Sequence, residues 1–497
     1  MFLAALARMV CACLLVCLMP ALSCAEDAVP TPEQVQAWQQ RASTGDSEAQ
    51  YRLGEYFILF DIGTLNNHGV DWLKQAAPNV LYAQAHLSLL LGGQPAPAGA
   101  ETAPWQDGER IRRQIFAEAE QQPANAEAQY WAGALLLFQD NKIHEALPYF
   151  RKSAGLGYAL AALRLGDMYQ YGKGVPADMT EAVKYFKQAA ELGNFLGQQK
   201  YGLYLMESGK EGAAAEAVQW FRKSAAQGFA LAQCVLGQAL RAGDGVRKNA
   251  EEAFSLFKKA AEQQCPTGMV RLYECYAAGQ GTEQDVEAGI VWLKKAADAG
   301  ESEGQSLLGD AFAAGAGVPQ DWAQALLWYG KAADNGYAPA AYALHKLHRD
   351  GTGVDKNMTI AAQLLRRAAE GGFALAQNEL GLSYEQGQYG TADEEIAVFW
   401  FRRAAQQGMA HGEYNYGLAL EAGKGGLVAN PAAAVNWYRK AAAQGLDVAL
   451  YALGVNYEKG IGVKASRDTA LGWYRKAAKA GSPAAKEALQ RLGGAEK

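Results

Sequence analysis

The amino-acid sequence predicts an all-α fold, an α-α superhelix (solenoid) of about twelve helix-turn-helix repeats. Three observations predict it. An apolar residue pair recurs at intervals within one residue of 36, a short polar residue usually precedes each pair by seven positions, and a glycine follows nearly every pair. A unit this short cannot bury its apolar face alone, so consecutive units are expected to stack on one another.

The apolar pair marks the second helix of each repeat. Small residues follow it, as in Lys331-Ala332-Ala333, which gives the helix an apolar side and a basic or polar side. In chain order the ten pairs are Tyr149-Phe150, Tyr185-Phe186, Trp220-Phe221, Leu256-Phe257, Trp292-Leu293, Trp328-Tyr329, Leu364-Leu365, Trp400-Phe401, Trp437-Tyr438 and Trp473-Tyr474.

The start and the end of this second helix are also encoded. Asp, Asn and Ser side chains can accept hydrogen bonds from the first turn of a helix, and glycine can take the left-handed conformation that closes one. The predicted caps are Asp178, Asn249, Asp285, Asp321, Asn357, Asp393, Asn430 and Ser466, with Lys142 and Ala213 as exceptions. The predicted stops are Gly157, Gly193, Gly228, Gly300, Gly336, Gly372, Gly408, Gly445 and Gly481, with Gln264 as the departure.

The first helix of each repeat carries Ala-x-Ala and then Leu-Gly. Examples are Leu165-Gly166, Leu236-Gly237, Leu308-Gly309, Leu380-Gly381 and Leu453-Gly454. Glycine inside a helix costs about 1 kcal/mol relative to alanine, so its recurrence predicts that the second helix crosses closely there. Gly-x-Gly turns such as Gly172-Lys173-Gly174 join the two helices. They follow helices rather than strands, which argues against phosphate-binding loops.

Together these columns resemble the Sel1-like repeat family. The resemblance is specific from about Ala126 to Gly481 and looser before it. It is similar to the tetratricopeptide repeat, with an added glycine-rich turn. The resemblance implies an adaptor that assembles protein complexes, in bacterial envelopes or in the endoplasmic reticulum.

The chain divides into four predicted segments. Residues 1–25 form a signal peptide, and residues 26–125 form degenerate helical repeats interrupted by the Pro/Ala-rich insertion 94–100. Residues 126–481 form ten Sel1-like repeats, and residues 482–497 form a C-terminal capping helix and tail.

The first residues predict export. Arg8 precedes an apolar stretch from Met9 to Leu22, and small residues flank Cys24, so we expect cleavage after Ala25. The stretch is too short to cross a bilayer, and no transmembrane segment is expected in the mature chain. We expect a periplasmic protein in a bacterium. The alternatives are secretion, or an outer-membrane lipoprotein anchored through Cys24, whose context resembles a lipobox.

Composition restricts the classes of partner. The sequence is 50% hydrophobic and 20% charged, with a formal net charge of -6, which is typical of a folded soluble protein. The basic residues are spread along the repeats and form no one-sided basic surface, so a nucleic-acid partner is not expected.

The sequence predicts no catalytic, cofactor or metal site. The six histidines are His68, His86, His144, His345, His348 and His411, and no nucleophile motif accompanies them. His345 and His348 have the spacing of a metal pair, with Asp350 and His411 as further candidate ligands. However, His345 occupies the column of the first-helix glycine and His348 a tyrosine column, which favours structural roles. Tyr273 replaces the same glycine.

Two smaller features also favour structural interpretations. Cys234, Cys265 and Cys275 are predicted to be buried thiols, because a helical repeat of this size needs no disulfides. The sequon Asn357-Met358-Thr359 begins at a residue that the repeat already uses as a helix cap.

The sequence therefore predicts an exported, non-enzymatic scaffold or adaptor that binds a protein partner, in assembly or regulation of a cell-envelope complex. It does not identify the partner or the partner-binding residues. Two alternatives stay open: a binder of cell-envelope glycan or peptidoglycan, and a cell-wall or β-lactam hydrolase.

Overall fold

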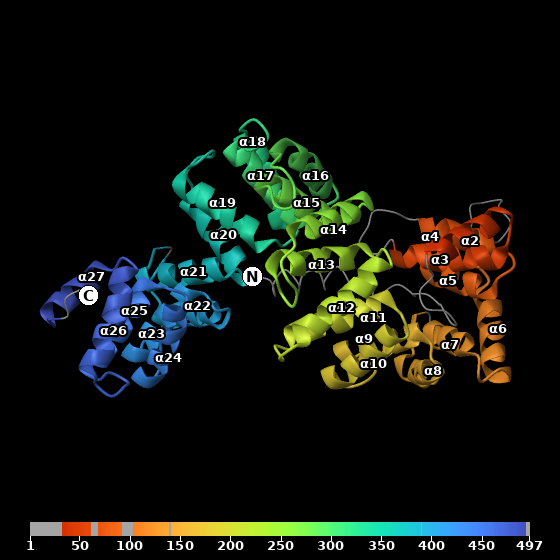
Figure 1. The fold of residues 1–497 in the computed structure, drawn as a ribbon, viewed down its shortest axis with the longest axis horizontal. Coiled ribbons are helices and arrows are strands. Elements are labelled where there is room, and N and C mark those ends of the chain that lie inside the picture. The colour runs from red at the N-terminus through yellow and green to blue at the C-terminus, as the bar shows by residue number, and fades with distance from the viewer. Residues whose placement is uncertain (1–31, 61–67, 92–102, 139–140, 389, 494–497) are drawn as a thin grey trace. The chain divides into compact units, whose positions relative to one another are not determined.

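A computed structural model describes residues 32–60, 68–91, 103–138, 141–388 and 390–493. Within these ranges every regular element is a helix, which confirms the predicted all-α class. The predicted signal segment, Cys24 and the insertion 94–100 lie outside the described residues. The chain forms two compact units, the first ending at Ala299 and the second beginning at Gly300 (Figure 1).

The described helices form twelve consecutive pairs, and we designate the first helix of each pair A and the second B. Helix α2 (Pro32–Ser43) precedes the pairs and α27 (Pro483–Arg491) follows them. The A helices are α3 (Ser47–Phe60), α5 (Leu81–Leu91), α7 (Ala126–Phe138), α9 (Ala159–Tyr171), α11 (Phe195–Glu207), α13 (Ala230–Ala242), α15 (Pro266–Ala278), α17 (Ser302–Ala314), α19 (Ala338–Asp350), α21 (Ala374–Gln386), α23 (Ala410–Ala422) and α25 (Asp447–Lys459). The B helices are α4 (His68–Ala76), α6 (Gly108–Gln121), α8 (Ile143–Gly155), α10 (Met179–Glu191), α12 (Ala213–Ala226), α14 (Ala250–Glu262), α16 (Val286–Asp298), α18 (Trp322–Asp334), α20 (Met358–Glu370), α22 (Glu394–Gln406), α24 (Pro431–Ala443) and α26 (Arg467–Lys479).

Within each unit the pairs stack as the repeat predicts. Each A helix packs along its own B helix, and that B helix packs on the A helix of the next pair (Figure 1). Some neighbouring A helices also touch, as α13 and α15 do in the first unit and α21 and α23 in the second. This nearest-neighbour packing is that of a solenoid.

The predicted caps are confirmed. Asp321 accepts a hydrogen bond from the backbone N–H of Gln324 at 3.0 Å, and the other seven predicted residues cap their B helices in the same way. At the predicted exceptions, Lys142 makes no side-chain cap, and α12 begins at Ala213 itself, after Gly212.

The change Asp321→Ala is expected to lower the free energy of unfolding by about 1 kcal/mol, because it removes the acceptor for a first-turn N–H. Urea denaturation of the two proteins measures the difference. Lys142→Ala is the matched control and leaves stability nearly unchanged, since Lys142 caps nothing. Equal losses in the two variants would contradict the capping role.

The predicted stops share one backbone conformation. All nine glycines of this column have positive φ, for example 82° at Gly336. Gln264, the single departure, takes the same conformation with φ of 63°. The column is therefore set by the left-handed closure of helix B, whichever residue provides it.

The recurring Leu-Gly of helix A lies where helix B crosses, as predicted. A Cβ atom added to Gly237 would lie 2.6 Å from Cε1 of Phe257, and one added to Gly309 would lie 2.8 Å from the ring of Tyr329. Side chains of this size fit only if the facing position has no Cβ. The corresponding contacts are Gly133–Phe150, Gly166–Phe186, Gly202–Phe221, Gly381–Phe401, Gly417–Tyr438 and Gly454–Tyr474.

Two helix pairs have the opposite arrangement, with the larger side chain on helix A and the smaller one on helix B. Tyr273 and His345 replace the glycine, and the crossing helix then carries a leucine, Leu293 or Leu365, in place of the second aromatic residue. Next to Tyr273 the crossing helix also has Gly289, where an added Cβ would lie 3.1 Å from the tyrosine ring. A large residue on helix A thus coincides with a smaller one on helix B, which keeps the packed volume similar.

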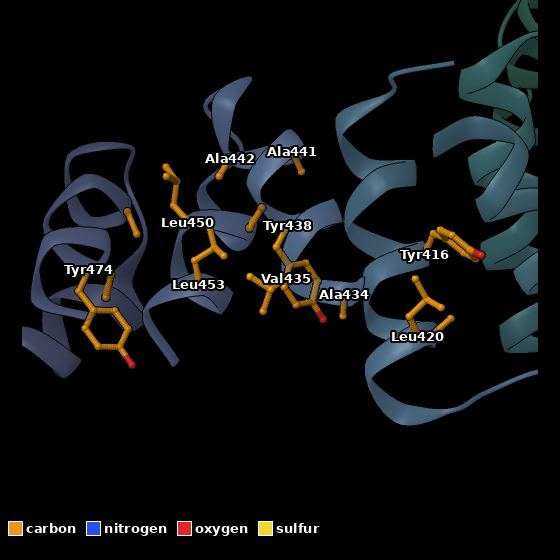
Figure 2. Packing of buried hydrophobic residues seen from close by; sticks show 14 of the residues in the cluster. Tyr416, Leu420, Ala434, Val435, Tyr438, Ala441, Ala442, Leu450, Leu453 and Tyr474 are labelled. Carbon is orange, nitrogen blue, oxygen red and sulfur yellow. The ribbon is translucent and has the colours of Figure 1, made fainter. Parts of the chain in front are cut away.

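The core runs between successive helices rather than in one centre. Figure 2 shows Val435 and Tyr438 of α24 and Leu450 and Leu453 of α25 in one cluster of buried residues. In this cluster Tyr438 is 1% exposed and Leu453 is fully buried. Residues that pack this way leave the outward positions of each helix free to vary.

Candidate partner-binding surface

Neighbouring A helices are linked by polar side chains on their shared face, which we designate the A face. In the first unit Lys200 donates to Asp167 at 2.8 Å. In the second, Arg349 donates to Glu379 at 2.7 Å. Each bond joins the A helices of consecutive pairs, so this face is continuous from one repeat to the next within a unit.

One column of the A face changes character along the chain. In the ten repeats from α7 to α26, the residue after the helix-A glycine position is polar in five repeats and aliphatic in the last three, while Ala134 and Leu203 are earlier apolar members. The polar members are Asp167, Gln238, Glu274, Asp310 and Lys346, and the late aliphatic members are Leu382, Leu418 and Val455. Because polar residues serve in this column elsewhere, packing does not require aliphatic ones.

The late aliphatic residues extend into a larger apolar surface. Leu418 is 40% exposed. Two helical turns earlier on the same side of their helices, Leu375 is 46% and Val448 is 38% exposed. We designate Leu375, Leu382, Leu418, Val448 and Val455 the A-face patch. Leu375, Leu418 and Val448 are exposed, while Leu382 and Val455 are partly buried against the core cluster. Exposed apolar residues mark interaction surfaces.

A pocket of about 170 Å³ opens beside Leu418, between α21, α22 and α23. Its apolar lining consists of Ala397, Val398, Phe401, Leu418, Ala419 and Ala422. Its polar lining consists of Glu385, Glu394, Asn415 and Lys424, and the Lys424 ammonium donates to Glu385 at 2.7 Å.

His345 belongs to a polar network between α19 and α21. Its Nδ1 donates to the Ala361 carbonyl at 2.8 Å, and its Nε2 lies 3.1 Å from Glu379 Oε1. Tyr342 donates to the other carboxylate oxygen at 2.7 Å, and Arg349 donates to the same carboxylate. Burial would raise the pKa of Glu379, but hydrogen bonds from His345 and Tyr342 and the charges of His345 and Arg349 outweigh it and lower that pKa to about 2.

The structure assigns His345 to packing and hydrogen bonding, as the sequence favoured. The imidazole is fully buried and both of its nitrogens have acceptor partners, whereas His411 is exposed on α23. In the part of the chain that the structure describes, no three His, Cys, Asp or Glu side chains are grouped to hold a metal ion.

The sequence analysis missed a buried glutamine column in the A helices. Gln377 donates to the Ala369 carbonyl at the end of the preceding B helix at 3.1 Å, and it accepts from Gln407 of its own B helix at 2.7 Å. One side chain thus links three helices. The recurrence was visible in the sequence at one register, as Gln50, Gln84, Gln129, Gln198, Gln233, Gln305 and Gln377.

In the repeat that begins at α23 this column carries Glu413, and Glu413→Gln is expected to stabilise the protein. Burial raises the pKa of Glu413, so its charged form at neutral pH is disfavoured in the fold. A glutamine can keep the bond that Gln444 donates at 2.8 Å and can donate to the Ala405 carbonyl. The expected gain at pH 7 is about 1 kcal/mol in urea denaturation.

The gain should shrink as the pH falls. A raised carboxyl pKa means that the folded state binds the proton more tightly than the unfolded state, so protonation stabilises the wild-type protein. A variant that is less stable than wild type at pH 7 would contradict this assignment.

Five tryptophans of the B helices are covered on one side by lysine. Lys331 Nζ lies 3.7 Å from the ring centroid of Trp328, which is a cation–π contact. The other pairs are Lys223–Trp220, Lys295–Trp292, Lys440–Trp437 and Lys476–Trp473. An ammonium on the ring competes with the sugar stacking that a glycan-binding function requires.

The three cysteines of the repeats are buried thiols that form no disulfide, as predicted. A hydrogen bond with Cys265 and burial both raise the pKa of Cys234. Burial raises the pKa of Cys275 to about 11. Neutral thiols of this kind pack as small apolar residues.

A family model described as the Sel1 repeat matches ten segments, at residues 47–77, 159–194, 196–229, 230–265, 268–301, 302–337, 338–373, 374–409, 410–446 and 447–482. The chain belongs to the Sel1 repeat family. The first of these Sel1 repeats lies in the segment that the sequence predicts to be degenerate, and the pair α7–α8 is not among the matches. Sel1 repeats generally form scaffolds for protein–protein interaction.

Three solved structures are similar to this Sel1 repeat chain. A protective antigen of uropathogenic Escherichia coli with an SLR fold is 28% identical over 92% of this chain and 90% of its own, with a TM-score of 0.46. A Sel1 repeat protein from Oxalobacter formigenes is 26% identical over 82% of this chain and 99% of its own, with a TM-score of 0.36. An immunity protein from Pseudomonas aeruginosa is 21% identical over 43% of this chain and 81% of its own, with a TM-score of 0.36.

Proposed function

We propose that this Sel1 repeat protein is an exported, non-enzymatic adaptor that binds a protein partner through the A-face patch. The carrying observation is that Leu418 is 40% exposed at a position that five other repeats fill with polar residues, and that Leu375 and Val448 of the same patch are also exposed. Exposed apolar surface gains free energy when a partner covers it, about 25 cal/mol per Å². The partner binds on α21, α23 and α25.

The N-terminal sequence supports export to the cell envelope. The segment from Arg8 to Ala25 has the pattern of a cleaved secretion signal, and we propose a periplasmic location and a role in assembly or regulation of an envelope complex. Among the described residues no helix combines the length and the apolar character needed to cross a membrane. The mass of the mature N-terminus distinguishes simple cleavage from lipid attachment at Cys24.

The polar groups of the described A face support binding rather than catalysis. The Glu379 carboxylate is held by Arg349, His345 and Tyr342, and Glu385 by Lys424. Groups committed to such bonds are poor proton donors and acceptors for a substrate.

Capture from envelope extract tests the proposal. The tagged wild-type chain is compared with Leu418→Asp, which places a charge in the A-face patch, and with Leu327→Asp. Leu327 is a matched control, because it is 48% exposed but lies on the B helix α18. We expect one protein at stoichiometric amounts with the wild type and the control, and at least tenfold less with Leu418→Asp.

Other outcomes contradict the proposal. Equal recovery with all three chains shows that the A-face patch is not the binding surface. Retention on purified glycan without a protein favours the glycan alternative. Turnover of a cell-wall or β-lactam substrate that survives purification and disappears on a single substitution favours the enzyme alternative.

A further inference from the structure

We propose that the pocket beside Leu418 binds one bulky apolar side chain of the partner polypeptide, with a Lys or Arg next to it in the partner sequence. This inference rests on the proposed function and names the chemistry of the partner. It is carried by the size of the pocket, its polar lining and its position beside the A-face patch.

The size of the pocket suits a single side chain. A protein cavity of about 150 Å³ lined by aliphatic and aromatic residues is large enough for benzene. The pocket here has about 170 Å³, and Ala397, Val398 and Phe401 of α22 line it together with Ala419 and Ala422 of α23. A Leu, Ile or Phe side chain fills such a space and is removed from water on entering it.

The residues next to the pocket depart from the regular repeat. From Gly423 to the cap at Asn430 the turn is one residue longer than from Gly172 to Asp178, and Gly425 and Gly426 both have positive φ. The turn lies against the start of α22: a Cβ atom on Gly425 would lie 2.5 Å from the Glu394 carbonyl.

The first residue of the B helix is different in α18 and in α22. In the repeat that begins at α19, the glycine equivalent to Gly425 is Gly353, and it lies against the indole ring of Trp322 at the start of α18. At the start of α22 the same register holds Glu394, whose side chain is exposed. The ring that occupies this place in α18 is absent at the start of α22, as it is at Ala250 of α14 and Pro431 of α24.

The polar lining attracts a cationic, hydrogen-bond-donating group. Lys424 pairs with Glu385, while Glu394 forms no ion pair with any residue that the structure describes, so this lining carries a net charge of about −1. Asn415 donates to Asn378 at 2.9 Å through Nδ2, which leaves its Oδ1 as an acceptor for a backbone N–H. A Lys or Arg beside the anchoring residue can donate to the Glu394 carboxylate.

The position of the pocket favours a polypeptide over a small amine. Leu418 lines the pocket and also belongs to the A-face patch, which continues onto α25 through Val448 and Val455. A chain anchored in the pocket can therefore cover further apolar surface on either side of its anchor.

Fluorescence anisotropy with the full chain tests the inference. The probes are labelled octapeptides of Gly and Ser with Phe-Lys, Ala-Lys or Phe-Glu at the centre. We expect Phe-Lys to bind about tenfold or more tightly than Ala-Lys, from burial of the ring. We expect Phe-Lys also to bind several-fold more tightly than Phe-Glu.

Three variants locate the binding. Ala422→Trp fills the pocket and should abolish the preference for Phe, whereas Glu394→Gln should reduce the preference for Lys over Glu. Ala314→Trp is the matched control, because Ala314 is exposed at the same register of α17. Helicity and urea midpoints check that all three variants fold. The inference is overturned if the three peptides bind equally or if none binds. It is also overturned if Ala422→Trp keeps the wild-type preference for Phe.

Capture from envelope extract separates this inference from the proposed function. If Ala422→Trp still recovers the stoichiometric partner that Leu418→Asp loses, the adaptor function stands and the pocket inference falls. If the wild type recovers no partner but shows the peptide preference, the pocket inference stands and the adaptor function falls.

Discussion

The change Gly381→His is expected to lower the free energy of unfolding by about 3 kcal/mol, and adding Phe401→Leu should recover much of that loss. A Cβ on Gly381 would lie 2.6 Å from Cε1 of Phe401, so an imidazole there overfills the crossing of α21 and α22. The preceding repeat already has the compensated combination, with His345 on helix A and Leu365 on helix B. The introduced imidazole can also donate a hydrogen bond to the Ala397 carbonyl, which is equivalent to the Ala361 carbonyl that accepts from His345.

A double-mutant cycle measures this coupling. Urea denaturation of the wild type, both single variants and the double variant should give a favourable interaction energy of about 2 kcal/mol. Gly472→His is the control, because a Cβ on that helical glycine meets nothing within 4 Å. The control should be neutral or stabilising by up to about 1 kcal/mol. Strict additivity in the cycle would contradict the account of the helix crossing.

The second large effect is expected for Glu379→Ala, which should cost about 3 kcal/mol at pH 7. The substitution leaves the fully buried His345 without its carboxylate partner and removes the acceptor of Tyr342. A buried polar group that loses its hydrogen-bond partner costs about 1–3 kcal/mol, and two such groups lose theirs here. The substitution also removes one of the two carboxylates that pair with Arg349, the other being Asp350. Glu385→Ala, which removes the more exposed partner of Lys424, is the control and should cost less than 1 kcal/mol.

The cost of Glu379→Ala should depend on pH in a defined direction. The pKa of Glu379 in the fold is about 2, below its ordinary value of 4.5, so the folded state binds the proton less tightly than the unfolded state. The stabilising contribution is fully present above about pH 5 and is lost as the pH falls from 4.5 towards 2. Urea midpoints of both proteins between pH 7 and pH 3 measure it, and a difference that does not narrow on acidification would contradict the assignment.

The packing of the repeat could be predicted because its rules depend on a few residue types. An Asp at 321, a glycine at 336 and the Gly309–Tyr329 crossing each have one dominant physical reason, and each recurs. The glutamine column that includes Gln377 also recurs, but a polar residue in a helix is expected to be exposed. Its burial follows only from the structure, in which Gln377 donates to the Ala369 carbonyl and accepts from the Gln407 amide.

The candidate site could not be predicted because it lies where the repeat does not constrain the sequence. Leu375 shares its column with the buried Leu160 and Leu231, and only its exposure distinguishes it from a core leucine. The pocket lies beside the long turn at Gly425, which is a single departure without periodicity. The partners of His345 lie on two other helices, Ala361 on α20 and Glu379 on α21. They could be identified only once the fold was known.

Site-specific photo-crosslinking in cells that produce the protein shows which surface the partner touches. A photoreactive residue is placed at position 418 on the A face or, as the control, at position 327 on α18, in otherwise wild-type chains. If the partner binds the A-face patch, position 418 gives one dominant protein adduct and position 327 gives none of that mass. An adduct of the same mass from position 327 alone, or no protein adduct from position 418, would contradict it.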